Sequence, residues 1–288
     1  MQHDESRGLA WPRLTKLLAW YGWVGCGLVA VFWPLNWLLP GFRTHLLFFP
    51  LWLGYALVID ALVLRRTSTS LITRSPRGFA MLFVLSVPGW WVFEVLNWRT
   101  GNWEYVGRNA FTDLEFLFYG SLSFSTVMPA VFGTAELVGS FAWLRRFADG
   151  PRVSLSVRKC VAWFAAGAAM LVLLLVWPTY FFPFMWLSGF FLLDPVCVWL
   201  GRPAILRSLA WGNWRPVIAL ALGTLICGFF WELWNFYSFP KWIYHVPFVG
   251  FLHVFEMPLL GYLGYPAFGL ELYALANLLR GKRSTPGI

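Results

Sequence analysis

Long apolar runs are the feature that most limits what this chain can fold into. A helix needs roughly 20 predominantly apolar residues to cross the hydrocarbon layer of a membrane. Hydrophobic residues make up 59% of the sequence and charged residues only 12%, whereas soluble domains carry about 25% charged residues. We therefore predict an all-α, polytopic transmembrane helical bundle with about eight spans. The runs lie near residues 17–39, 46–64, 78–97, 115–144, 160–179, 181–200, 216–236 and 252–279.

Basic residues fall in alternate connections between these runs, which predicts the orientation. Cytoplasmic loops carry the excess of Lys and Arg, so we expect a multi-pass protein of the cytoplasmic (inner) membrane with both termini in the cytoplasm. No signal peptide is expected, because Asp4 and Glu5 precede the first basic residues. The formal net charge of +9 comes from these connections, so we expect no nucleic-acid partner. The main basic clusters are Arg65, Arg66, Arg74 and Arg77; Arg145, Arg146, Arg152, Arg158 and Lys159; and Arg202, Arg207 and Arg215.

One unusual pattern occurs twice. Segment 93–97 (Phe-Glu-Val-Leu-Asn) returns as segment 231–235 (Trp-Glu-Leu-Trp-Asn), and a Trp-x-Tyr sequence follows each copy, starting at Trp103 and at Trp242. Each copy places a carboxylate and an amide inside an apolar run. We interpret this echo as an internal duplication.

The duplication predicts how the spans are arranged. A charged connection separates the halves, and each half holds about four spans. Because an even number of spans returns each half to its starting side, we predict two parallel four-helix repeats related by an axis along the membrane normal. The predicted segments are a cytoplasmic N-terminal segment 1–16, a first repeat 17–146, a cytoplasmic linker 147–159, a second repeat 160–279 and a cytoplasmic tail 280–288.

Acidic residues are scarce, with only 13 in the chain, and a central charge costs about 3 kcal/mol to insert in a span. Glu94 and Asn97 are three residues apart, as are Glu232 and Asn235, so each pair shares one helical face. We interpret the two pairs as lining a cavity between the halves. The alternative is that Glu94 and Glu232 cap loops or pair with Arg99 and Lys241. The candidate catalytic residues are Glu94, Asn97, Glu115, Glu232, Asn235 and Glu256, and the candidate proton-path residues are Asp60 and Asp194.

Aromatic residues crowd the same predicted noncytoplasmic layer as the glutamates. Trp and Tyr are typical of both membrane interfaces, so many of them are expected to form interfacial belts, while others can line a site. The irregular segment 255–266 is a further candidate wall of that site, or simply a packing and kink segment. The candidate substrate-binding residues are Trp90, Trp98, Trp103, Tyr105, Trp231, Trp234, Trp242 and Tyr244.

Metal and disulfide chemistry have little support in the sequence. The four cysteines lie inside predicted spans without paired spacing, and the four histidines are scattered. We therefore expect no metal site and no cofactor.

The first half resembles the membrane-type lycopene cyclases of bacteria and fungi. That family carries a Trp-x-Tyr sequence after an acidic helix end, followed by a Pro-x-Glu-Glu-x-x-Phe-Phe segment. Here the resemblance lies in Asn97, Trp103-Glu104-Tyr105 and segment 113–119, with a looser second copy in Glu232, Trp242, Tyr244 and Glu256. The chain departs from the pattern because no proline precedes Glu115, and a proline follows Glu256 instead of preceding it.

The resemblance implies isoprenoid chemistry in the bilayer. An acid would protonate a terminal double bond, a ring would close through a carbocation, and a base would remove a proton. The expected partner is then a membrane lipid or isoprenoid ligand. Two alternatives stay open: a proton-coupled transporter or lipid-handling protein, and a structural subunit of a membrane complex. Association as a homo-oligomer is also open.

Overall fold

The computed structural model describes residues 17–280, and most of these residues are helical. The predicted N-terminal segment 1–16, and the tail after Arg280, lie outside the described residues. Six helical segments are long and apolar enough to cross a membrane. They are α2 (Thr44–Thr67), α4 (Pro76–Thr100), α5 with α6 (Asp113–Phe124 and Val127–Gly139), α7 (Val157–Val176), α8 to α9 (Pro178–Phe181 to Ser188–Trp199) and α11 (Arg215–Phe236).

Two of the eight expected spans are not among these six. In α1 (Trp20–Leu38), Trp, Tyr and Asn residues interrupt the apolar sequence. The last run, expected over residues 252–279, begins with short strands and a turn of 3₁₀-helix, so that α12 (Gly264–Arg280) has only 17 residues. The predicted all-α class therefore holds for most of the chain, and the structure supports six apolar crossings within the described residues.

The remaining elements are short. Two strands, β1 (Trp103–Val106) and β2 (Lys241–Tyr244), form an antiparallel pair, and β3 (His253–Val254) pairs with β4 (Met257–Pro258). The other short elements are α3 (Leu71–Arg74), α10 (Ile205–Ala210), η1 (Arg108–Ala110), η2 (Ala142–Phe147), η3 (Phe182–Trp186) and η4 (Leu259–Leu263).

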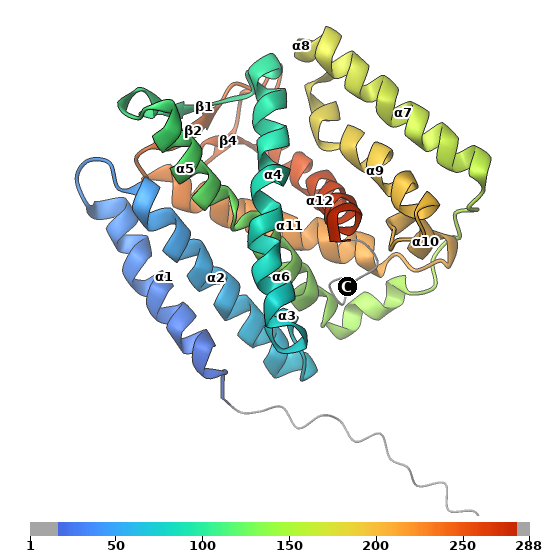
Figure 1. Ribbon diagram of the computed structural model, residues 1–288, viewed down its shortest axis with the longest axis horizontal. Coiled ribbons are helices and arrows are strands. Elements are labelled where there is room, and N and C mark those ends of the chain that lie inside the picture. The colour runs from blue at the N-terminus through green and yellow to red at the C-terminus, as the bar shows by residue number, and fades with distance from the viewer. Residues whose placement is uncertain (1–16, 281–288) are drawn as a thin grey trace, which may run out of the picture.

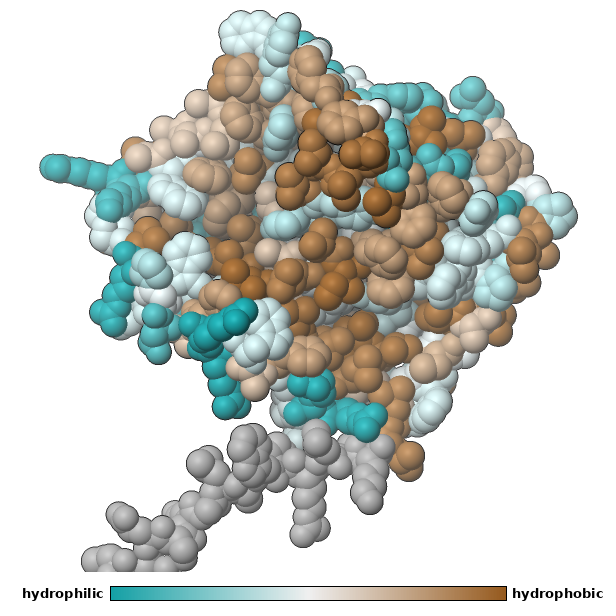
Figure 2. All heavy atoms as spheres, turned by 180° about the vertical axis from the view of Figure 1, so that it is seen from behind, coloured by the Kyte–Doolittle hydropathy of each residue, from teal (hydrophilic) through white to brown (hydrophobic). Residues whose placement is uncertain are grey.

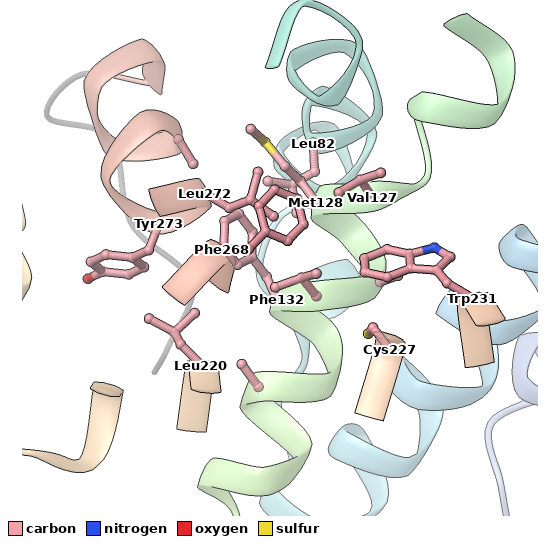
Figure 3. Close-up of a cluster of buried hydrophobic side chains, with 14 of the residues drawn as sticks. Leu82, Val127, Met128, Phe132, Leu220, Cys227, Trp231, Phe268, Leu272 and Tyr273 are labelled. Atoms are coloured by element: carbon pink, nitrogen blue, oxygen red, sulfur yellow. The ribbon is translucent and has the colours of Figure 1, made fainter. Parts of the chain in front are cut away.

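The helices form one bundle with its core in the middle (Figure 1). α1 and α2 pack together at one side, α7 and α9 at the other, and α4, α6, α11 and α12 lie between them. Nearly every residue of α6 is buried. Figure 3 shows Phe132 of α6, Leu220 of α11 and Phe268 of α12 among the side chains of the central hydrophobic cluster.

Apolar side chains also cover the outside of the bundle. Figure 2 shows them over much of one face, with hydrophilic side chains mainly near its margins. Large exposed hydrophobic residues occur on α1, α4 and α7, for example Trp23, Val84 and Val172. A soluble protein rarely exposes an apolar surface this large. The outer surface therefore matches an integral membrane protein.

The central crossing of α6 and α11 depends on a glycine. A Cβ atom added at Gly223 would lie 2.7 Å from the backbone N and Cα of Ala135. Small residues allow helix backbones in membranes to approach this closely. The two helices at the centre of the bundle therefore touch through backbone atoms.

We expect Gly223→Ala to lower the stability of the protein by about 1–3 kcal/mol, because an overpacked core must shift its backbone. Gly27→Ala in α1 is the matched control, since a Cβ atom there meets nothing within 4 Å. Thermal unfolding in mild detergent compares the two variants. Equal unfolding temperatures for both would contradict the predicted contact.

Candidate functional site beneath two paired strands

The strands β1 and β2, here called the lid strands, bring the two Trp-x-Tyr sequences together. Their register places Trp103 opposite Tyr244 and Tyr105 opposite Trp242. Because alternate residues of a strand point to the same face, these four aromatic side chains share one face of the pair. All four line a single cavity.

Each lid strand is held by the asparagine of its own half. Asn97 donates from Nδ2 to the carbonyl of Trp103 at 2.7 Å, and its Oδ1 accepts the backbone N–H of Asn102 at 2.8 Å. Asn235 makes the matching pair of bonds to Trp242, at 2.7 Å to the carbonyl and 2.9 Å from the N–H. The two asparagines therefore replace a neighbouring strand and fix the lid strands to α4 and α11.

The cavity beneath the lid strands has a volume of about 470 Å³ and a predominantly apolar wall that is rich in aromatic residues. This size lies within the usual range of small-molecule sites, about 300–1,000 Å³. Trp231, Phe268 and Val127 line it and also belong to the core cluster (Figure 3), so its inner wall is continuous with the core of the bundle. The charged side chains in the wall are Arg108 and Lys241.

Glu94 lies behind this wall and accepts three hydrogen bonds on one oxygen. Trp90 Nε1 donates to its Oε1 at 2.8 Å, Trp103 Nε1 at 3.2 Å and the Tyr105 hydroxyl at 2.6 Å. We call these four residues the Glu94 cluster. The three donors line the cavity, so hydrogen bonds connect the carboxylate to residues of the cavity wall.

Glu232 occupies the corresponding place in the second half and has no exposed surface. Its Oε1 accepts the hydroxyls of Tyr244 at 2.7 Å and Tyr265 at 2.6 Å, while Trp242 Nε1 donates to the Tyr244 hydroxyl at 2.8 Å. We call these four residues the Glu232 cluster. Its two tyrosines and its tryptophan also line the cavity.

The lid tyrosines are neutral hydrogen-bond donors. Burial raises the pKa of the Tyr105 phenol well above its ordinary value, and the nearby carboxylate of Glu94 raises it further. Burial and Glu232 have the same effect on the pKa of Tyr244. Both phenols therefore keep their protons over the physiological pH range.

The alternative ion pairs of the two glutamates do not form. Arg99 donates instead to the carbonyl oxygens of Leu175 and Val176 at the end of α7. Lys241 forms an ion pair with Glu256. Arg99 therefore pairs with a helix end and Lys241 with another acid, while Glu94 and Glu232 are hydrogen-bonded by aromatic residues.

Two candidate catalytic carboxylates lie elsewhere. Glu115 is exposed and forms a capping box with Thr112 at the start of α5, with the Thr112 backbone N–H donating to its Oε2 at 2.8 Å. Glu256 lies beside the cavity wall in its ion pair with Lys241. Neither residue lines the cavity.

Two candidate aromatic residues also lie outside the cavity wall. Trp98 is 79% exposed on the outer surface of α4, as expected for an interfacial residue. Trp234 is buried, and its ring packs against Trp52 and Tyr55 in the core. The other six candidate aromatic residues line the cavity.

The candidate proton-path residues hold short helices. Asp60 of α2 accepts the backbone N–H of Ile72 in α3 at 3.1 Å. Asp194 of α9 accepts the N–H groups of Ile205 and Leu206 in α10 at 2.8 and 2.9 Å. The backbone N–H groups at the start of a helix have no partner within the helix, and the two aspartates supply one. The same arrangement occurs in both halves.

Tyr265 is a site residue that the sequence analysis did not single out. It lies at the start of α12, within the irregular segment that was a candidate wall, and contacts Glu232 across 33 positions of sequence. No spacing rule connects residues so far apart. The sequence analysis gave segment 255–266 as a candidate wall, with a packing and kink segment as the alternative, and this was the signal nearest to Tyr265.

The chain matches no family model, no curated protein and no solved structure in the three comparisons. Among residues 17–280, no group of three or more His, Cys, Asp and Glu side chains has the arrangement of a metal site.

We expect Asn97→Ala to loosen the first lid strand, because each lost hydrogen bond contributes about 1 kcal/mol. Backbone amides of residues 102–106 should then exchange with deuterium at least about tenfold faster, measured by mass spectrometry in detergent. Asn277→Ala is the control, since this buried residue of α12 has no hydrogen bond to either lid strand in the described part of the chain. Unchanged exchange in the Asn97 variant would show that the amide does not hold the strand.

Proposed function

We propose that this protein is an integral membrane enzyme that binds an isoprenoid in the aromatic cavity and acts on it by general-acid chemistry. The observation that carries the proposal is the cavity itself: an apolar, aromatic chamber with two buried carboxyl groups that meet it through tyrosine hydroxyls. A polyene isoprenoid offers only apolar and π contacts, and this wall complements them.

The composition of the cavity wall suits a reaction that passes through a carbocation. Protonation of a carbon–carbon double bond leaves a carbocation, and water would trap that cation before a ring could close. A mainly apolar wall disfavours water, while the faces of tryptophan and tyrosine rings stabilise a nearby positive charge. General-acid catalysis by a positioned group contributes about 10²–10⁴-fold in rate.

The internal duplication is part of the proposal. Matching bonds support it: an asparagine holds each lid strand, a glutamate accepts each lid tyrosine, and an aspartate caps the short helix before each glutamate-bearing helix. The two repeats would enclose the substrate between them. In this arrangement the lid strands lie on the noncytoplasmic side, and the basic connections face the cytoplasm.

The same cavity favours an enzyme over the alternatives. A proton-coupled carrier would need polar groups leading from the site to both aqueous faces, whereas Asp60 and Asp194 have backbone partners at helix ends. A purely structural subunit has no need of an internal chamber. Resemblance to membrane-type lycopene cyclases fits the cavity and the Trp-x-Tyr sequences, but Glu115 acts as a helix cap in this chain.

We expect the purified wild-type protein to carry an isoprenoid and to convert lycopene, supplied in membrane vesicles, to a cyclic isomer. Glu94→Gln and Glu232→Gln should each reduce conversion by about 10²-fold or more, because an amide keeps the size but cannot transfer the proton. Chromatography with mass spectrometry measures the product and identifies the bound lipid.

Glu104→Gln is the matched control, because this lid residue is exposed beside His245 and lies outside the cavity wall. It should convert lycopene at the wild-type rate. Bulk phospholipid as the sole bound lipid, together with no conversion, would refute the enzyme proposal and favour a carrier or a structural subunit.

A further inference from the structure

The Glu94 and Glu232 clusters differ in the kind of hydrogen-bond donor that each carboxyl group meets. At Glu94, two of the three donors to Oε1 are indole N–H groups, from Trp90 and Trp103. An indole N–H can donate but cannot accept. A proton on this oxygen would therefore face two groups that can only donate, and only Tyr105 could accept it. Three donors on one oxygen suit an ionised carboxylate.

At Glu232 both direct partners are phenols, which can donate or accept. The indole of Trp242 donates to the Tyr244 hydroxyl at 2.8 Å. Tyr244 thus has its oxygen engaged and directs its own proton toward Glu232. Tyr265 donates its hydroxyl to Glu232 Oε1 at 2.6 Å in the structure. Because a phenol can also accept, the same contact allows a protonated Glu232 to donate to Tyr265.

The second oxygen of Glu232 supports the same conclusion. Its Oε2 is buried and has no hydrogen-bond partner among the described residues. A charged oxygen left bare in an apolar interior is strongly unfavourable. In a neutral carboxyl group protonated on Oε1, however, Oε2 is a carbonyl oxygen that carries little charge.

We propose that the two carboxyl groups have opposite resting states, with Glu232 neutral and delivering its proton to the cavity through Tyr265, and Glu94 ionised and receiving a proton through Tyr105. The catalytic part of this assignment rests on the proposed isoprenoid function. The assignment of the two protonation states without substrate depends only on the hydrogen-bond geometry.

The proposed step balances without an oxidant or another reactant. Tyr265 gives its proton to the less substituted carbon of the terminal double bond and takes the proton of Glu232, so a C–H bond forms and the positive charge lies on the more substituted carbon. A second double bond attacks this cationic carbon and closes the ring, which moves the positive charge to a carbon of that second double bond. Tyr105 then takes a proton from the carbon next to the new cation and gives its own proton to Glu94, leaving a cyclic isomer. Exchange with water restores both carboxyl groups.

Infrared difference spectroscopy of the purified protein tests the resting states without any substrate. The carbonyl band of a neutral carboxylic acid should be smaller in Glu232→Gln than in wild type and unchanged in Glu94→Gln. Tyr265→Phe should shift this band, because the acid loses its acceptor. Tyr262→Phe is the control, since this hydroxyl donates to the carbonyl of Val254 and lies outside the cavity wall.

A neutral-acid band that disappears in Glu94→Gln, or that is the same in Glu232→Gln and wild type, would overturn the assignment. Should Glu232→Gln fail to fold, the Tyr265→Phe shift decides the question, and an unmoved band would overturn it.

Turnover in D₂O tests the catalytic part, with lycopene as the probe. Wild type should place deuterium in the cyclic product, and Tyr265→Phe should reduce this incorporation by about 10²-fold. Glu94→Gln should still label the carbon skeleton while forming little normal product, whereas Glu232→Gln should not label it. Equal labelling in the two glutamine variants would overturn the division of roles. Absence of conversion by wild type would refute the proposed function and leave the resting states to the infrared result.

Discussion

The need to pair every backbone polar group in an apolar medium governs this structure. Water cannot pair the polar groups of a buried helix end or strand edge, so the few buried polar side chains are placed where regular structure stops. Asn97 and Asn235 complete the lid strands, and Asp60 and Asp194 complete short helices. Arg99 closes the end of α7. The irregular backbone above the cavity is stable because side chains of the spans supply its missing partners.

This constraint explains why local sequence patterns identified residues that lie together at the centre of the candidate site. The Glu–Asn spacing and the Trp-x-Tyr sequences are short-range features, and helix and strand periodicity fix their direction. Glu94, Asn97, Trp103 and Tyr105 consequently fall into one cluster, and their counterparts into another. Long apolar runs likewise predicted a helical membrane protein, although the composition of α1 and the shortness of α12 left six qualifying crossings among the described residues.

The rest of the site depends on contacts that no local pattern records. Trp98 and Trp234 belong to the same glutamate-bearing segments as the cavity residues, yet one points outward and the other into the core. Glu115 satisfies its own helix start. Tyr265 reaches Glu232 only because α12 packs against α11. Helix rotation and long-range packing decide these positions, and a single sequence gives neither.

The pairing of one strand from each half has a consequence for biogenesis. Until the second half has been made, β1 has no partner strand, so the nascent first half carries a strand with an unpaired edge. The chamber is thus a property of the joined halves, and neither half encloses it alone. If the two halves were produced as separate chains, they would have to associate before the chamber could form. Ligand binding would then depend on the concentration of the halves.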